Sequence, residues 1–252
     1  MSTDIVVHAD ARVLIEAVAA RLLVRLVDAQ AARGEAAVVL TGGRTADSVY
    51  RAVAASPARH AVNWARVDLW WGDERFLPAG HPDRNATQAE ESLGMLPLDP
   101  ARVHPMPASD GPDGADPEAA AARYARDLAA AGHPASLPHF DVLLLGVGDD
   151  GHIASIFPEH PATYEARTVC AVRGAPKPPP LRLSLTLPAL RHAEQVWLVA
   201  AGPEKSGAVN LALSGGGPTQ VPASGVHGVD RTLWLLDRAA AAHVAPRLRA
   251  LH

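Results

Sequence analysis

The strongest constraint on the fold of this chain is a series of short, uninterrupted apolar runs, most of them followed at once by glycine and polar side chains. The runs occupy residues 36–40, 66–71, 140–147, 195–201 and 232–237. Continuous apolar runs, unlike an apolar–polar alternation, are typical of strands that are buried on both faces of a parallel sheet. We therefore expect a mostly parallel sheet covered by helices.

Helical segments separate these runs. Residues 11–34 carry apolar side chains at helical spacing, with Asp10 as a good N-cap and Gly34 as a natural stop. Further helices are expected at residues 45–55, 117–131, 206–214 and 239–252, and residues 181–187 are a strand candidate with unassigned pairing. The alternation predicts a doubly wound α/β fold with helices on both faces of the sheet. Because neither a repeat nor a clean boundary is visible, we expect a single domain over residues 1–252.

The composition excludes several classes of protein. With 48% hydrophobic and 20% charged residues, the 252-residue chain has the balance of a globular protein. Its net charge of -4, without a basic run, gives no general attraction for nucleic acid or an acidic membrane. No apolar stretch is long enough to span a bilayer, so we expect a cytoplasmic protein without a membrane partner. We also expect no nucleic-acid partner, and a monomer or small homo-oligomer. The single cysteine, Cys170, excludes internal disulfides and is expected to be buried.

Four polar segments follow the predicted strands. They are Thr-Gly-Gly-Arg-Thr at residues 41–45, Gly-Asp-Glu-Arg at 72–75, Gly-Asp-Asp-Gly-His at 148–152 and Gly-Pro-Glu-Lys at 202–205. Open α/β sheets bind ligands in the crevice beyond the carboxyl ends of their strands. We therefore expect these segments, which are far apart in the sequence, to meet at one site.

The first of these segments has the features of an anion site. Gly42 and Gly43 precede a predicted helix, so that backbone N–H groups and the helix N-terminus could face a phosphate. The simpler interpretation is a tight turn that needs glycine for its geometry alone. Lys205 lies at a similar turn, where phosphate contact and ordinary solvation are equally compatible with the sequence.

Arg75 and His152 are the candidate reactive residues. Arg75 could form a weak surface ion pair with Asp73 or Glu74, or it could face a substrate. The segment around His152 could be a turn with solvated aspartates, a metal site or an acid–base pair. A metal would need more ligands than one aspartate and one histidine, so we expect none. The acid–base interpretation requires only a carboxylate that orients His152, because histidine titrates near neutral pH.

Taken together, the motifs resemble those of the 6-phosphogluconolactonases over nearly the whole chain. The most specific string is Gly-Val-Gly-Asp-Asp-Gly-His-Ile-Ala-Ser-Ile-Phe-Pro at residues 146–158. The others are Gly42, Gly43 and Thr45, Trp71 to Arg75 with Pro82, Asp83 and Asn85, Lys177 to Leu185, and Gly202 to Lys205. The resemblance implies a hydrolase of the pentose phosphate pathway that converts 6-phospho-D-glucono-1,5-lactone to 6-phospho-D-gluconate without metal or cofactor. It also implies a fold shared with the glucosamine-6-phosphate deaminases.

The resemblance further implies roles for individual residues. Asp150 would orient His152, which would activate water for attack on C1 of the lactone, and Arg75 would stabilise the developing charge or hold the substrate. The residues expected to bind the substrate or its phosphate are Gly42, Gly43, Arg44, Thr45, Asp73, Gly148, Arg182 and Lys205. Arg44, Ala46, His81 and Arg84 depart from the residues that are frequent in the family.

Two alternatives remain open at this point. In the related deaminases a glutamate that assists the histidine stands where this chain has Phe157, and an aromatic residue stands in place of Arg75. Both departures favour the lactonase. The second alternative is a non-catalytic sugar-phosphate sensor, because related domains serve as effector-binding modules of transcription regulators. No helix-turn-helix region is recognisable in this chain.

Overall fold

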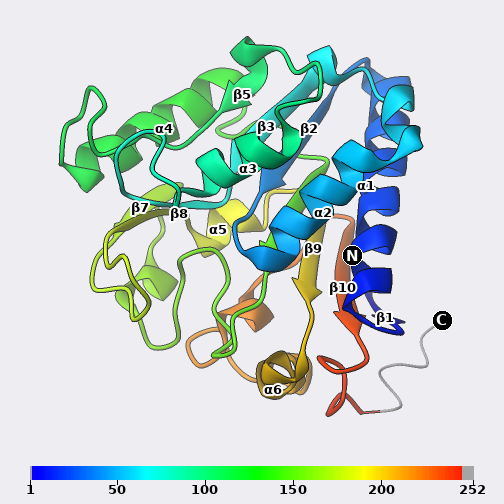
Figure 1. Ribbon diagram of the computed structural model, residues 1–252. Coiled ribbons are helices and arrows are strands. Elements are labelled where there is room, and N and C mark those ends of the chain that lie inside the picture. The colour runs from blue at the N-terminus through cyan, green and yellow to red at the C-terminus, as the bar shows by residue number, and fades with distance from the viewer. Residues whose placement is uncertain (1, 246–252) are drawn as a thin grey trace.

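The structure, a computed structural model, describes residues 2–245, and its centre is a 7-stranded parallel sheet (Figure 1). The strand order is β1-β10-β9-β6-β2-β3-β5. The strands are β1 (Ser2–His8), β2 (Ala36–Leu40), β3 (Val67–Trp71), β5 (Val103–His104), β6 (Val142–Gly146), β9 (Gln195–Ala200) and β10 (Arg231–Asp237). Every residue of β2 is buried, as expected for a strand covered on both faces. The predicted parallel α/β fold is confirmed.

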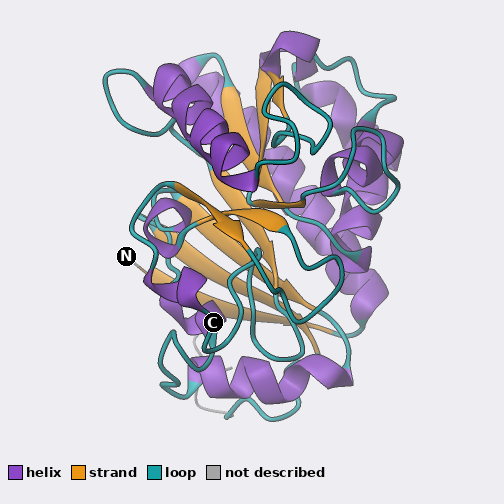
Figure 2. Cartoon of the chain, turned by 90° about the vertical axis from the view of Figure 1, so that its left-hand side faces the viewer, coloured by secondary structure: helices purple, strands orange, loops and turns teal. Residues whose placement is uncertain are grey.

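Helices lie on both sides of the sheet (Figure 2). They are α1 (Ala11–Arg33), α2 (Arg44–Ala55), α3 (Asn85–Leu93), α4 (Pro117–Gly132), α5 (Leu187–Leu190) and α6 (Ser206–Leu213), with 3-10 turns η1 (Pro57–Ala61), η2 (Trp64–Arg66), η3 (Pro100–Arg102), η4 (Pro161–Tyr164), η5 (Pro203–Lys205) and η6 (Pro222–Gly225). Helix α1 packs against α2, and α2 packs against α3. Among residues 2–245, no helix has the length and apolar character needed to cross a membrane.

Helix α1 begins and ends where the sequence predicts. Asp10 accepts a hydrogen bond from the N–H of Val13 at 2.8 Å, and Gly34 follows the last turn with a φ of 80°. Glycine adopts this left-handed conformation with the least strain and lets the chain satisfy the last carbonyls of the helix. The apolar side of α1, which includes Leu14 and Leu22, is buried, and the helix packs against β10, β2 and β1.

A small antiparallel sheet follows directly from the end of β3. It consists of β4 (Asp73–Arg75), β8 (Arg182–Leu185) and β7 (Val169–Val172), in that order. The sequence does not predict this sheet, because β4 has three residues and pairs with a segment far along the chain. Its register places Arg75 directly opposite Arg182. Like charges at opposite positions are unfavourable, so this pairing creates a positive site that an anion can neutralise.

The two ends of the chain differ from the expectation. Ser2–His8 forms an edge strand parallel to β10, although Ile5 is its only buried residue and the pattern is too weak to recognise. The predicted helix at residues 239–252 is wrong for residues 239–245, which form turns, and residues 246–252 lie outside the described residues. Asp237 accepts a hydrogen bond from the N–H of Ala240 at 2.7 Å, as an N-cap does, but the turn that it caps does not continue as a helix within residues 239–245.

A buried aspartate ties α1 to the amino ends of β2 and β6. The side chain of Asp141 is 1% exposed and accepts a hydrogen bond from the N–H of Ala37 at 2.9 Å. It also pairs with Arg33 and, at 3.4 Å, with Arg25. A buried carboxylate is stable when it is paired and hydrogen-bonded in this way.

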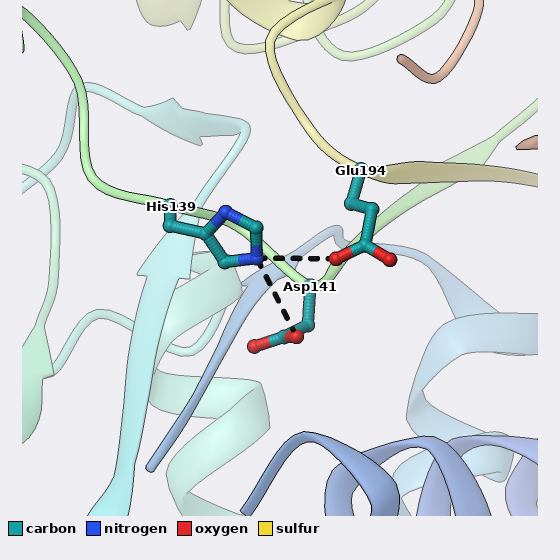
Figure 3. A group of neighbouring side chains, drawn as sticks. All are labelled: His139, Asp141 and Glu194. Carbon is teal, nitrogen blue, oxygen red and sulfur yellow. Dashed lines mark hydrogen bonds and ion pairs between the residues drawn. The ribbon is translucent and has the colours of Figure 1, made fainter. Parts of the chain in front are cut away.

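His139 and Glu194 extend the same cluster (Figure 3). Nε2 of His139 points toward Asp141 and Glu194, at 3.7 Å and 3.1 Å from their carboxylate oxygens. The three side chains are close enough to hold a metal ion. However, the guanidinium groups of Arg25 and Arg33 already balance the two negative charges, so the cluster serves as an ion-pair network that holds the sheet to α1.

Replacement of Asp141 by alanine is expected to destabilise the protein strongly. The change leaves Arg25 and Arg33 without their buried partner, and the free energy of unfolding should fall by about 3 kcal/mol. Urea denaturation measures this difference. Arg51→Ala is the matched control, because Arg51 is 62% exposed in its pair with Asp47 and its loss should change stability little. Equal effects of both changes would contradict the assigned role of Asp141.

Candidate active site

The four polar segments meet at a cavity of about 400 Å³. Its wall is formed by the segments that follow β2, β6 and β9, together with residues of the small sheet. The predicted site residues that line it are Gly42, Gly43, Arg44, Thr45, Asp73, Arg75, Gly148, His152, Arg182 and Lys205. Asp150 is the predicted site residue that does not line the cavity, because it contacts His152 instead.

His152 and Asp150 are in direct contact. Nδ1 of His152 lies 2.5 Å from Oδ1 of Asp150, and the same oxygen accepts a hydrogen bond from the N–H of His152 at 3.1 Å. Partial burial alone would raise the pKa of Asp150, but the hydrogen bonds and charge of His152 hold that pKa well below its ordinary value. Asp150 is therefore ionised and orients the ring. With Nδ1 engaged, Nε2 is the nitrogen that can accept a proton from water.

Gly148 provides the space that this pair requires. The loop turns back on itself, with the N–H of Gly148 donating to the carbonyl of His152 at 2.8 Å. A Cβ atom on Gly148 would overlap Nδ1 of His152 and the carboxylate of Asp150. The glycine is therefore needed for close contact between the histidine and the aspartate.

Phe157 fills the position beside the imidazole. Its side chain is 1% exposed, and its ring centroid lies 4.7 Å from that of His152. The guanidinium carbon of Arg182 lies 5.7 Å from the centroid of the same phenyl ring. An apolar ring can hold the imidazole by packing but cannot exchange a proton, so Asp150 is the carboxylate that assists His152.

Arg75 does not form the surface ion pair that the sequence allows. Glu74, which is fully buried, instead pairs with Arg84 at 3.6 Å and accepts hydrogen bonds from the N–H groups of Arg75 and Asn85. Nη1 of Arg75 donates to the carbonyl of Asp83 at 2.6 Å, while its Nε is buried and has no partner among residues 2–245. The guanidinium of Arg75 is thus held at the cavity by the carbonyl of Asp83.

Arg182 has more intramolecular partners than the sequence suggests. Its Nε donates to the carbonyl of Pro179 at 3.1 Å, and its Nη2 donates to the carbonyls of Lys177 and Pro178 at 2.9 Å and 3.1 Å. Burial lowers the pKa of Arg182, and the carboxylate of Asp73 opposes this effect. Arg182 therefore shapes the loop at residues 175–180 as well as lining the cavity.

Three guanidinium groups line the cavity, those of Arg44, Arg75 and Arg182. Arg44 begins α2, Arg75 ends β4 and Arg182 begins β8. Because these elements are far apart in the sequence, only the folded chain brings the three charges together. Three positive side chains around one cavity make it suited to a negatively charged ligand.

The segments after β2 and β9 form the anion-binding side of the cavity. Gly43 is the N-cap of α2 with a φ of 100°, and no side chain caps this helix. Its first N–H groups are thus available to a ligand, next to Arg44, which is exposed. Lys205, at the start of α6, lines the same cavity. N–H groups and cations together favour a phosphate at this end.

Some residues of the site were given no role by the sequence motifs alone. Asp73 accepts a hydrogen bond from Oγ of Ser155 at 2.7 Å and from Nδ2 of Asn85 at 3.3 Å. Ser155 and Asn85 both belong to the sequence motifs, and this membership was the signal that could have identified them as site residues. Their residue types do not reveal that they hydrogen-bond Asp73. Helix α1 also contributes Ala11 and Ile15 to the wall, and an ordinary amphipathic helix carries no signal for this.

The loop at His152 also brings a third potential metal ligand into range. Ligand atoms of Asp149, Asp150 and His152 all lie within 4.8 Å of one another. Asp149 is paired with the ammonium group of Lys177, which lowers the pKa of that carboxyl below its ordinary value. A positive charge therefore already lies at Asp149, and a metal ion would have to compete with it.

Comparison with known proteins agrees with this architecture. Residues 9–234 match the family model described as glucosamine-6-phosphate isomerases/6-phosphogluconolactonase. A 6-phosphogluconolactonase of Streptomyces coelicolor is 60% identical over 96% of this chain and 94% of its own length. One from Mycobacterium tuberculosis is 45% identical over 96% of this chain and 98% of its own. The chain therefore belongs to the glucosamine-6-phosphate isomerase/6-phosphogluconolactonase family, which confirms the resemblance seen in the motifs.

Solved structures show the same fold. The 6-phosphogluconolactonase of Trypanosoma brucei superimposes with a TM-score of 0.81 at 28% identity, and covers 97% of this chain and 99% of its own. A monomeric glucosamine-6-phosphate deaminase superimposes with a TM-score of 0.78 at 21% identity, over 95% of this chain and 99% of its own. The fold is thus common to both branches of the family, and the site residues must distinguish between them.

Replacement of Gly148 by alanine is expected to reduce turnover without unfolding the protein. The new methyl group would displace His152 or Asp150, and a shift of that size can cost on the order of a hundredfold in kcat. The measurement is the rate of 6-phosphogluconolactone hydrolysis, the reaction after which the relatives are named. Gly146→Ala is the matched control, because its Cβ would meet no atom closer than the carbonyl of Gly42 at 3.8 Å. Similar losses of turnover in both variants would show that contact of the new methyl group with His152 and Asp150 is not the cause.

Proposed function

We propose that the protein hydrolyses 6-phospho-D-glucono-1,5-lactone to 6-phospho-D-gluconate. The observation that carries the proposal is the His152–Asp150 pair in a cavity that also holds three guanidinium groups, Lys205 and an uncapped helix N-terminus. Such a cavity suits a substrate with a reactive carbonyl at one end and a phosphate at the other. The 60% identical relative, which is named for this reaction, supports the same assignment.

In the first step, His152 acts as a general base. Nε2 removes a proton from water while the water oxygen attacks C1 of the lactone, and Asp150 stabilises the imidazolium through Nδ1. The electrons of the carbonyl bond move to its oxygen, which gives a tetrahedral oxyanion. The positive charge of Arg75, whose side chain lines the cavity, can stabilise this oxyanion.

In the second step, the bond between C1 and the ring oxygen breaks. The proton on Nε2 of His152 passes to that oxygen, which becomes the C5 hydroxyl, and the histidine returns to its neutral form. The new carboxylic acid releases its proton to solvent. One water has then been added across the ester bond, and the proposed cycle uses no metal ion or cofactor.

The two alternative functions are less well supported. A deaminase with a glutamate beside its histidine would need that carboxylate where Phe157 packs against the ring of His152. A sensor without catalysis would have no need for an imidazole oriented by an ionised aspartate.

We also propose the setting in which the protein acts. A substrate that carries a charged phosphate does not cross a bilayer readily, so the enzyme would act in the cytoplasm, within the pentose phosphate pathway. The proposed unit is the whole chain as one domain, because one cluster of buried side chains extends from Ile5 to Val244. It would act as a monomer or small homo-oligomer, without nucleic-acid or membrane partners.

Replacement of His152 by alanine is expected to lower kcat by a factor on the order of a hundred to ten thousand. This is the usual contribution of a general base, and the variant should still fold because the side chain lies at the cavity wall. Steady-state hydrolysis of the lactone measures the loss, after correction for its spontaneous opening. His60→Ala is a control at an exposed histidine. Unchanged turnover in a folded His152→Ala variant would place the base elsewhere.

Replacement of Lys205 by alanine is expected to lower kcat/KM for the phosphorylated substrate alone. A charge-assisted hydrogen bond to the phosphate contributes about 1.5 to 3 kcal/mol, so kcat/KM should fall roughly ten- to hundredfold on 6-phosphogluconolactone. On unphosphorylated glucono-1,5-lactone, which should be a poor substrate, the variant and the wild type should be equal. Equal losses on both lactones would assign Lys205 to the carbonyl end or to the fold.

A further inference from the structure

Arg84 is a buried cation beside the active site to which the proposed cycle gives no role. It is the N-cap residue of α3, and its side chain is 4% exposed. A charged group is stable inside a protein only when it is paired and hydrogen-bonded. Arg84 is paired with Glu74, whose side chain is 0% exposed, at 3.6 Å between Nη2 and Oε2. Removal of either partner would leave the other as an uncompensated buried charge, so the pair is a fixed point of the fold.

The guanidinium of Arg84 also ties two distant stretches of chain to its own position. Nη2 donates to the carbonyl of Met106 at 2.6 Å, and Nη1 donates to those of Leu77 and Pro107 at 3.0 Å and 3.4 Å. Nη1 further donates to the carbonyl of Arg75 at 3.5 Å. A planar guanidinium can hold several acceptors in one fixed geometry, which an ammonium group cannot do. The loop at residues 77–84 is thus closed at its base by a single side chain.

The carboxylate of Glu74 orders the backbone on both sides of this loop. Oε1 accepts from the N–H groups of Arg75 and Asn85 at 2.8 Å and 2.7 Å, and Oε2 accepts from the N–H of Ala86 at 2.9 Å. Asn85 and Ala86 begin α3, which has no side-chain hydrogen bond from its N-cap, so Glu74 takes that place. Burial raises the pKa of Glu74, and the charge of Arg84 opposes this rise. Arg84 therefore favours the ionised form of Glu74, which accepts these bonds.

The closed loop holds the guanidinium of Arg75 at the cavity. Nη1 of Arg75 donates to the carbonyl of Asp83 at 2.6 Å, and Asp83 directly precedes Arg84. Across the small sheet, Arg75 is opposite Arg182, a side chain of the same charge. Without a fixed acceptor at Asp83, repulsion between these two guanidinium groups would displace Arg75. The position of Arg75 therefore depends on a loop that Arg84 closes.

We propose that Arg84 is a positioning residue that fixes the guanidinium of Arg75 for the reaction. The inference rests on the proposed function, in which Arg75 stabilises the oxyanion. Arg84 does not itself line the cavity, so it acts through Glu74 and the carbonyl of Asp83. A charge stabilises a transition state best when it is in place before the reaction begins, because no reorganisation is then needed. Loss of Arg84 should therefore lower kcat more than it raises KM.

The test is a double-mutant cycle of Arg84→Met and Arg75→Ala, with kcat for 6-phosphogluconolactone as the measurement. Methionine keeps an unbranched side chain but removes the charge and the donors. With Arg75 present, Arg84→Met should lower kcat by a factor on the order of ten to a hundred, the effect of a misplaced group. In the Arg75→Ala background the same change should lower kcat by about threefold or less, because the group that Arg84 positions is already absent.

Two control variants separate positioning from stability. Arg102→Met removes an arginine that is held by two carboxylates, at 2.6 Å from Asp68 and 3.0 Å from Glu35, but at the amino ends of the strands. It should leave kcat of the folded protein unchanged. Arg84→Lys keeps a positive charge beside Glu74 but loses the planar set of donors, so it should lower kcat less than Arg84→Met does. Circular dichroism gives the folded fraction by which each rate is corrected.

The outcomes separate the inference from the proposed function. A folded wild type that does not hydrolyse the lactone would contradict the proposed function. Wild-type turnover with an equal fall from Arg84→Met in both backgrounds, or no fall in either, would overturn the positioning role alone. A similar fall in Arg102→Met would also overturn it, because loss of an ion pair anywhere would then explain the effect.

Two further results decide the remaining cases. Unchanged kcat in Arg75→Ala would remove the role of Arg75 in the reaction and the inference with it. If Arg84→Met fails to fold, the same cycle with Arg84→Lys takes its place. A fall in kcat that disappears in the Arg75→Ala background would then support the positioning role, and equal effects in the two backgrounds would overturn it.

Discussion

The pairing of β6 with both β2 and β9 is the constraint on which the rest of the site depends. Val142 of β6 pairs with Val38 of β2 on one side and with Gln195 of β9 on the other. Because the three strands are parallel, the segments that follow them leave the sheet at one edge. A slip in register would move buried side chains out of the core, so burial holds the catalytic loop and the anion-binding turns in place.

The small antiparallel sheet supplies the charges that complete the site. Its register sets Arg75 opposite Arg182, while Asp73 occupies the other end of the same short strand. Repulsion between the two guanidinium groups is tolerated because Arg75 bonds the carbonyl of Asp83 and Arg182 bonds the carbonyls of its neighbouring loop. The fold thus holds positive charge at the cavity before any ligand arrives, which is the condition for electrostatic stabilisation of an oxyanion.

Much of the main sheet could be predicted because its signals are local. Asp10 and Gly34 mark the ends of α1, and the apolar runs mark the strands with small errors at their ends. The predicted helix was wrong for residues 239–245, where Asp237 caps a single turn that does not continue, and the proline at position 246 disfavours the helical conformation at the residue before it. Strand β4 could not be predicted, because three residues carry no periodicity and their partner is distant.

By itself, the sequence determined five strands of the main sheet, the helices α1, α2, α4 and α6, the polar segments at the strand ends and the family to which they belong. Only the tertiary structure decided how individual side chains are paired. Glu74 meets Arg84 instead of Arg75, and Asn85 keeps an oxygen without a partner among residues 2–245. Residue type states how many hydrogen bonds a side chain can make, but the partners depend on which segments meet when the chain folds.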